Sequence, residues 1–101
     1  MKPFRTIIAA ALILLAPLVA AQAYSGHQYA KQVRISLAEA RAIALKAFPG
    51  KILKQELEQE AGGSGLRYSF DIRNQQTVHE VGVDAKTGKL LENSDDSNDK
   101  D

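Results

Sequence analysis

Residues 36–50 read SLAEARAIALKAFPG and contain the clearest structural signal in the chain. Ser36 followed by Leu-Ala-Glu39 is a capping box, in which each side chain hydrogen-bonds the other residue's backbone N–H at the start of a helix. Strong helix formers fill positions 37–48, and Pro49 with Gly50 ends the pattern. The stretch therefore predicts a helix over residues 37–48.

One face of this helix is apolar and rich in alanine. Its members recur at helical spacing: Leu37, Ala40, Ile43, Ala44, Ala47 and Phe48. Small alanine side chains allow a helix to lie close against a sheet. The opposite face, with Glu39 and Lys46, carries too few basic residues for a helix that binds a membrane surface. We therefore expect a core helix packed on a sheet.

The residues after Gly50 alternate between apolar and polar side chains, as half-buried antiparallel strands do. In residues 53–60, Leu53, Gln55 and Leu57 share one face, and the other face is charged: Lys54, Glu56, Glu58 and Glu60. Helical propensity in 54–60 leaves a second helix open as an alternative. The charged face is interpreted as solvated, although it could also form an acidic docking face.

Residues 66–73 are the best strand in the sequence. Their inward set is Leu66, Tyr68, Phe70 and Ile72, and their outward set is Arg67, Ser69, Asp71 and Arg73. A third strand covers 79–84, with His79 on its apolar phase, and a short fourth strand covers 89–92. Loops are expected at 62–65, 74–76 and 84–88. The result is an α+β fold, with one helix packed on a three- to four-stranded antiparallel sheet.

The first 23 residues have the three parts of a secretory signal peptide. Lys2 and Arg5 form a positive start, and residues 7–16 are an unbroken apolar run. Ala21-Gln-Ala23 then offers small residues at a cleavage site, which makes Tyr24 the new N-terminus. An uncleaved membrane anchor is the alternative. This apolar stretch is too short for it, because about 20 apolar residues are needed to span a bilayer. We expect cleavage between Ala23 and Tyr24, and export to the periplasm or medium of a bacterium.

The two ends of the remaining chain lack hydrophobic periodicity. Residues 24–34 are predicted to be a flexible lead-in, residues 35–92 the folded domain, and residues 93–101 a disordered acidic tail. Asp95, Ser97, Asp99 and Asp101 alternate in this tail as calcium ligands do. Lys100 stands where a calcium loop needs glycine, so the tail is interpreted as solubilising and no metal site is assigned.

Length and charge limit the function classes. Removing 23 residues from 101 leaves 78, enough for one small domain, and the chain has no cysteine that could brace it. Without Lys2 and Arg5, the 13 basic residues become 11 against 12 acidic ones, a formal net charge of −1. This balance gives no electrostatic reason to expect nucleic acid as a partner, and we expect no membrane association after cleavage.

The sequence offers no catalytic constellation. A hydrolase triad needs a positioned base, and the two histidines are His27 in the lead-in and His79 on a strand. The glycine-rich stretch at 62–65 lacks the Lys-Ser/Thr of a nucleotide loop and precedes a strand instead of a helix. We therefore expect no enzyme activity and no cofactor.

The capped helix, the Phe48-Pro-Gly50 stop and the closing Val81-Gly-Val-Asp84-Ala-Lys-Thr87-Gly88-Lys-Leu segment together resemble the PepSY domain family. The resemblance covers roughly residues 35–92 and implies a module similar to the cystatin-like wrapping of a sheet around a helix. Such modules occur in propeptides of secreted thermolysin-type metallopeptidases, and the family is suspected of restraining peptidases. Asp84, Thr87 and Gly88 are, by this resemblance, structural turn residues.

Three function classes follow. The first is an exported, non-enzymatic protein-binding module, a peptidase inhibitor or modulator that works through a sheet edge or sheet face. The second is an envelope accessory that senses a ligand or cation through its acidic tail or open sheet face. The third is a structural or self-associating protein, which the thin core favours because dimerisation would bury more apolar area.

Overall fold

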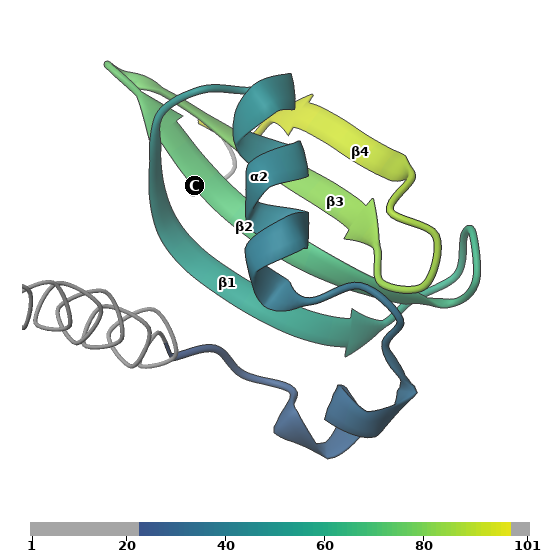
Figure 1. Ribbon diagram of the computed structural model, residues 1–101. Coiled ribbons are helices and arrows are strands. Elements are labelled where there is room, and N and C mark those ends of the chain that lie inside the picture. Colours follow the sequence, from purple (N-terminus) through teal and green to yellow (C-terminus); the bar gives the residue numbers. More distant parts are fainter. Residues whose placement is uncertain (1–22, 98–101) are drawn as a thin grey trace, which may run out of the picture.

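The computed structural model describes residues 23–97. The elements, in order, are η2 (His27–Gln32), α2 (Leu37–Ala47), β1 (Lys51–Gln59), β2 (Leu66–Asn74), β3 (Thr77–Asp84) and β4 (Leu90–Asp95). The strands form one antiparallel sheet in the order β1-β2-β3-β4, and α2 lies across one of its faces (Figure 1). The predicted α+β fold is therefore confirmed, and residues 51–59 form a strand, not a second helix. The predicted signal peptide, apart from Ala23, and residues 98–101 of the predicted tail lie outside the described residues.

Helix α2 begins as its sequence predicts. The Ser36 N–H donates to Glu39 Oε1 at 2.8 Å, and the Glu39 N–H donates to Ser36 Oγ at 3.0 Å, so both halves of the capping box are formed. Ala40 and Ala44 are completely buried against the sheet. Because neither side chain extends beyond a methyl group, the helix backbone can approach the strands closely.

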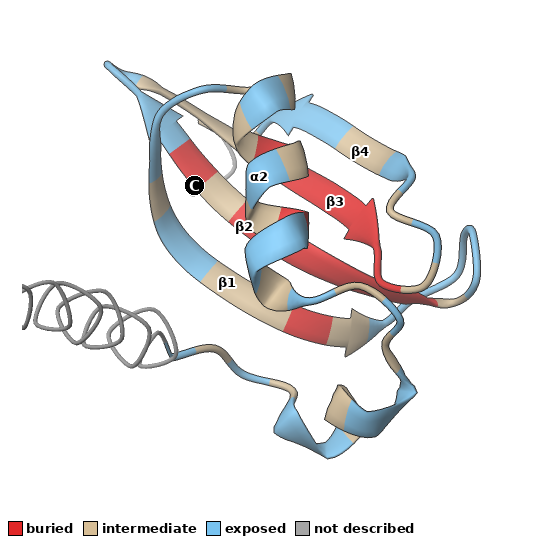
Figure 2. Ribbon diagram, viewed as in Figure 1, coloured by how far each residue is buried: buried red, intermediate tan, exposed pale blue. Residues whose placement is uncertain are grey.

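The core lies between α2 and the inner face of β2 and β3, where most of the buried residues in Figure 2 are found. Tyr68 is paired with Val83 in the adjacent strand, and Phe70 with Val81. The hydroxyl of the buried Tyr68 donates to the Ile35 carbonyl at 3.0 Å, which satisfies its polar group and ties the residues before α2 to the sheet. The predicted inward faces of both strands are confirmed.

The prediction for Leu53 is wrong. Strand β1 shifts register between Ile52 and Lys54, so Leu53 has no partner in β2 and remains 44% exposed. Ile52 takes the inward position instead, opposite Ile72. A β-bulge inserts one residue into a strand and reverses the alternation on one side of it, which explains why simple alternation assigned Leu53 to the core.

The lead-in is more regular than the sequence predicts. Residues 27–32 form the 3₁₀ helix η2, and Ser25 makes an isolated parallel bridge with Glu56. The Leu57 N–H donates to the Ser25 carbonyl at 2.8 Å. The N-terminal segment therefore lies along the outer edge of β1, where Figure 1 shows η2 beyond the end of that strand.

The prediction of a disordered tail over residues 93–101 is wrong for residues 93–97, because β4 continues to Asp95 instead of ending at Glu92. Beyond β4, the Asp96 N–H donates to the Val78 carbonyl at 2.7 Å, and the Val78 N–H donates to Ser97 Oγ at 2.8 Å. Backbone pairing with β3 requires no apolar side chain, so the polar composition of residues 93–97 did not reveal it.

Candidate functional site

The turn between β3 and β4 contains the three residues singled out in the sequence. Asp84 Oδ1 accepts from the backbone N–H groups of Lys86 and Thr87 at 2.8 and 3.1 Å. Gly88 has φ of +80°, in the left-handed region, and donates its N–H to the Asp84 carbonyl at 2.9 Å. These contacts close a turn and bring no reactive groups together.

Asp84 is also the attachment point of the loop between β1 and β2. Its carboxylate accepts from the Ser64 N–H at 2.7 Å and from the Ser64 hydroxyl at 2.8 Å, and the side chain is 1% exposed. Burial alone would raise the pKa of Asp84. The hydrogen bonds from Ser64, Lys86 and Thr87 outweigh burial and lower the pKa to about 2.

Both histidines take part in ring stacks. His27 stacks on Tyr24 with ring centroids 4.4 Å apart, and His79 stacks on Phe48 at 3.7 Å. His79 Nδ1 also lies 2.6 Å from Asn93 Oδ1. Within residues 23–97, neither ring hydrogen-bonds a serine or threonine hydroxyl, so neither histidine is placed to activate a hydroxyl nucleophile there.

The helix-free face of the sheet is polar, and its centre is buried. Arg67 and Ser69, which were predicted to face solvent, are only 6% and 7% exposed. Arg67 lies across Gly82 and donates from Nη1 to Glu92 Oε1 and from Nη2 to the Ala61 carbonyl, both at 3.2 Å. Because Gly82 has no side chain, the Arg67 side chain can lie close against β3, where its neighbours cover it.

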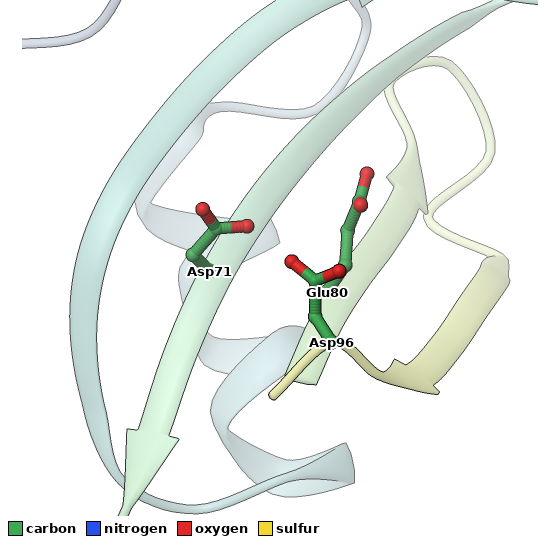
Figure 3. Close-up of side chains that lie close together, drawn as sticks. All are labelled: Asp71, Glu80 and Asp96. Atoms are coloured by element: carbon green, nitrogen blue, oxygen red, sulfur yellow. The ribbon is translucent and has the colours of Figure 1, made fainter. Parts of the chain in front are cut away.

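Three carboxylates on the helix-free face come within reach of one another. Asp71 from β2, Glu80 from β3 and Asp96 after β4 each offer an oxygen, and these oxygens lie within 4.8 Å of one another (Figure 3). Burial raises the pKa of Glu80 to about 7, and the negative charges of Glu92, Asp71, Asp96 and Glu58 add to the shift. An oxygen-only cluster of this kind could hold a hard cation such as Ca²⁺.

The outer edge of β1 carries a groove of about 320 Å³. Its lining residues are Ala23, Arg41, Ile52, Leu53, Lys54 and Gln55. Arg41 reaches it from α2 and donates from Nη1 to Gln55 Oε1 at 2.6 Å, and Gln55 Nε2 donates to the Ala23 carbonyl at 2.7 Å. Ala23 and Tyr24, the residues on either side of the predicted cleavage site, thus lie beside β1; cleavage itself stays a prediction.

Sequence reasoning missed both the groove and the carboxylate cluster. Alternation did place Asp71 on the outer face of β2, and it could have placed Glu80 beside it, since the two are register partners. Asp96 could not be assigned, because the sequence contains no sign that the chain returns over β3 after Asp95. The groove forms where the lead-in, α2 and the bulge of β1 meet, and only the bulge is local in sequence.

Comparisons with known proteins agree with the resemblance seen in the sequence. The family model described as "PepSY: Peptidase propeptide and YPEB domain" matches residues 34–93, which include α2 and all four strands as far as Asn93. No curated protein and no solved structure matches the chain. Among residues 23–97, no helix has both the length and the apolar character needed to cross a membrane. The chain therefore belongs to the PepSY family.

Proposed function

We propose that this protein is an exported, non-enzymatic protein-binding module that inhibits or modulates a secreted or periplasmic peptidase. The observation that carries the proposal is the PepSY match over residues 34–93, a family whose description names peptidase propeptides. The geometry agrees with it: the histidines are engaged in stacks, and the sheet offers an open edge and a polar face as binding surfaces.

Inhibition assays test this function. The purified protein is titrated against a panel of secreted peptidases, including thermolysin-type metallopeptidases, with a fluorogenic peptide as substrate. We expect saturable inhibition of at least one enzyme and co-elution of the pair on gel filtration. If no enzyme in the panel is inhibited or bound, the peptidase-directed form of the proposal fails.

Export is part of the proposal, because a secreted peptidase must meet its modulator outside the cytoplasm. The leader-like residues 1–23 support it. N-terminal sequencing of the protein from the periplasm or medium of the bacterium should begin at Tyr24. A membrane-bound form that retains Met1 would contradict it.

A second candidate is a cation-sensing accessory of the envelope, and the cluster of Asp71, Glu80 and Asp96 favours it. Calorimetry with CaCl₂ should then show a saturable site, accompanied by a rise in melting temperature. Glu80→Gln should abolish both effects, whereas Glu60→Gln, a change at an exposed carboxylate just after β1, should not. Absence of binding at millimolar Ca²⁺ would remove this candidate.

Self-association is compatible with either function. Light scattering measures it directly, because a dimer has twice the mass of the monomer. The full chain has a mass of 11.0 kDa, and removal of the leader would lower the monomer mass accordingly.

A further inference from the structure

Among residues 23–97, half of the outer edge of β1 has no strand partner. In the sheet order β1 is one of the two edge strands, and within residues 23–97 its outer side is bridged only by Ser25 at Glu56. The two hydrogen bonds of this bridge differ in length. The Leu57 N–H donates to the Ser25 carbonyl at 2.8 Å, whereas the Ser25 N–H lies 3.5 Å from the Gln55 carbonyl. In the part of the chain that the structure describes, the lead-in pairs with the second half of β1, and no residue pairs with the outer edge of residues 51–54. Ala23 lies beside this segment, and the predicted cleavage after Ala23 would remove it. An unpaired edge can accept an extended peptide as a further strand.

The groove beside this open segment has an apolar side. Leu53 is 44% exposed because the bulge turns it away from the core, and it lines the groove together with the half-buried Ile52. In a strand, alternate side chains point to the same side, so a peptide paired with β1 would place every second side chain toward this surface. An apolar side chain of the peptide would bury Leu53.

The charged residues that line the groove, Arg41 and Lys54, are both basic. Arg41 is half-buried, its partner Gln55 is neutral, and it forms no ion pair among the described residues. Lys54, the other cation of the lining, is held 3.0 Å from Glu56, and no carboxylate lines the groove. A partly buried guanidinium without a counter-ion is complementary to a carboxylate, which it can bind in a bidentate manner.

We propose that the β1 edge from Lys51 to Lys54 binds an extended, acidic segment of a partner protein. The segment adds as an outer strand, packs an apolar side chain on Leu53 and places a carboxylate on Arg41. This inference rests on the proposed protein-binding function and names where the partner binds and the class of segment that is bound.

The electrostatics of the molecule make the sign of the peptide's charge decisive. The helix-free face is acidic around Asp71, Glu80 and Asp96, so a basic segment would be drawn to that face. An acidic segment is repelled there and attracted to Arg41. The two surfaces therefore select peptides of opposite charge.

The test uses the protein purified from the cells that express it and three labelled peptides. The first alternates valine with glutamate, and the other two carry glutamine or lysine in place of glutamate. Binding is measured by fluorescence anisotropy at low salt, and the site is mapped from backbone amide NMR shifts. We expect the glutamate peptide to bind best and to shift the amides of residues 52–55.

Two variants with matched controls locate the contacts. Arg41→Gln should weaken binding of the glutamate peptide about fivefold, because one partly exposed charge pair is lost. Binding of the glutamine peptide should stay unchanged. Arg73→Gln, a change of an exposed arginine on β2, should have no effect. Leu53→Ala should weaken binding of both peptides. The control is Leu90→Ala, at a leucine that is 41% exposed on the opposite edge strand, and it should weaken binding of neither peptide.

The outcomes separate this inference from the proposed function. Tighter binding of the lysine peptide, or shifts confined to β4 or the helix-free face, would overturn the docking edge. If a peptidase is inhibited equally by the wild-type, Arg41→Gln and Leu53→Ala proteins, the function stands and the docking edge fails. If the glutamate peptide binds at residues 52–55 but no peptidase is inhibited, the edge stands and the peptidase-directed function fails.

Discussion

The carboxylate of Asp84 accepts both the backbone N–H and the hydroxyl of Ser64, at 2.7 and 2.8 Å. Ser64 belongs to the loop that joins β1 to β2, and Asp84 ends β3, so this one side chain links two connections at the same end of the sheet. The same carboxylate closes the turn that leads to β4. Asp84 thus holds together the loop between β1 and β2, the end of β3 and the turn to β4.

Replacing Asp84 with asparagine should destabilise the fold by about 2 kcal/mol, the usual contribution of buried hydrogen bonds to a charged group. The asparagine oxygen can replace Oδ1, which accepts from the Ser64 hydroxyl and from the N–H groups of Lys86 and Thr87. The NH₂ group that then replaces Oδ2 cannot accept from the Ser64 N–H, so that buried hydrogen bond is lost. Urea unfolding followed by circular dichroism measures the change. The control is Asp95→Asn, since Asp95 accepts from Ser97 on the exposed end of β4 and should alter stability by less than about 0.5 kcal/mol.

Asp84 also makes stability fall in acid. Its pKa is lowered from 3.8 to about 2, so the folded state binds its proton less readily than the unfolded state. The resulting stabilisation is fully present above pH 4 and is lost as the pH falls from 4 toward 2. Unfolding free energies measured across this window should decline in the wild type. In Asp84→Asn the decline should be shallower, and an unchanged slope would contradict this role.

Glu80 should act in the opposite direction. Its pKa is raised from 4.5 to about 7, so the folded state retains a proton that the unfolded state has released. Stability should therefore fall as the pH rises from 5 to 8, by about 1 kcal/mol after allowance for solvent screening of this partly exposed group. Glu80→Gln should remove this pH dependence, and Glu60→Gln, at an exposed position, should preserve it.

The close packing of α2 on the sheet predicts a strong position dependence for substitutions of alanine. Ala44 is completely buried, so Ala44→Leu should force the helix away from the strands and cost about 2 kcal/mol. Ala42 is exposed on the same helix, and Ala42→Leu should change stability by less than about 0.5 kcal/mol. Thermal unfolding of the two variants provides the comparison, and equal losses would show that α2 is less tightly packed.

The sequence predicted the elements whose information is local and periodic. The capping box at Ser36 and the alternation in residues 66–73 each describe one element in isolation, and both are present in the structure. The family resemblance was likewise carried by contiguous segments, and the family match covers the same part of the chain.

The features that sequence analysis missed depend on contacts between elements. Leu53 is displaced by a β-bulge, and no residue type in β1 indicates that bulge in the sequence. Arg67 is buried because it lies against Gly82 of the neighbouring strand. Gly82 interrupts the pattern of β3 and was a usable signal for a side chain crossing that position. To predict the groove at Arg41 one would have to know the path of the lead-in, and the lead-in sequence has no hydrophobic periodicity from which to infer it.

The docking of the lead-in on β1 should depend on Gly26. A Cβ atom there would overlap the Leu57 carbonyl oxygen, and the residue has φ of +96°. Gly26→Ala should therefore detach the segment and break the hydrogen bond from the Leu57 N–H to Ser25. Hydrogen exchange at the Leu57 amide reports this directly and should become faster, while exchange at Phe70 in the centre of the sheet stays slow.

Gly65 supplies the matched control for this substitution. It has a similar φ of +93°, but a Cβ atom built there meets nothing within 4 Å. Gly65→Ala therefore adds the backbone strain of a left-handed alanine, about 1 kcal/mol, without the overlap. Faster exchange at Leu57 in Gly26→Ala but not in Gly65→Ala would assign the effect to close contact with β1. Equal exchange in the two variants would mean that backbone strain alone loosens this end of the sheet, and that the lead-in is not held by its fit to Leu57.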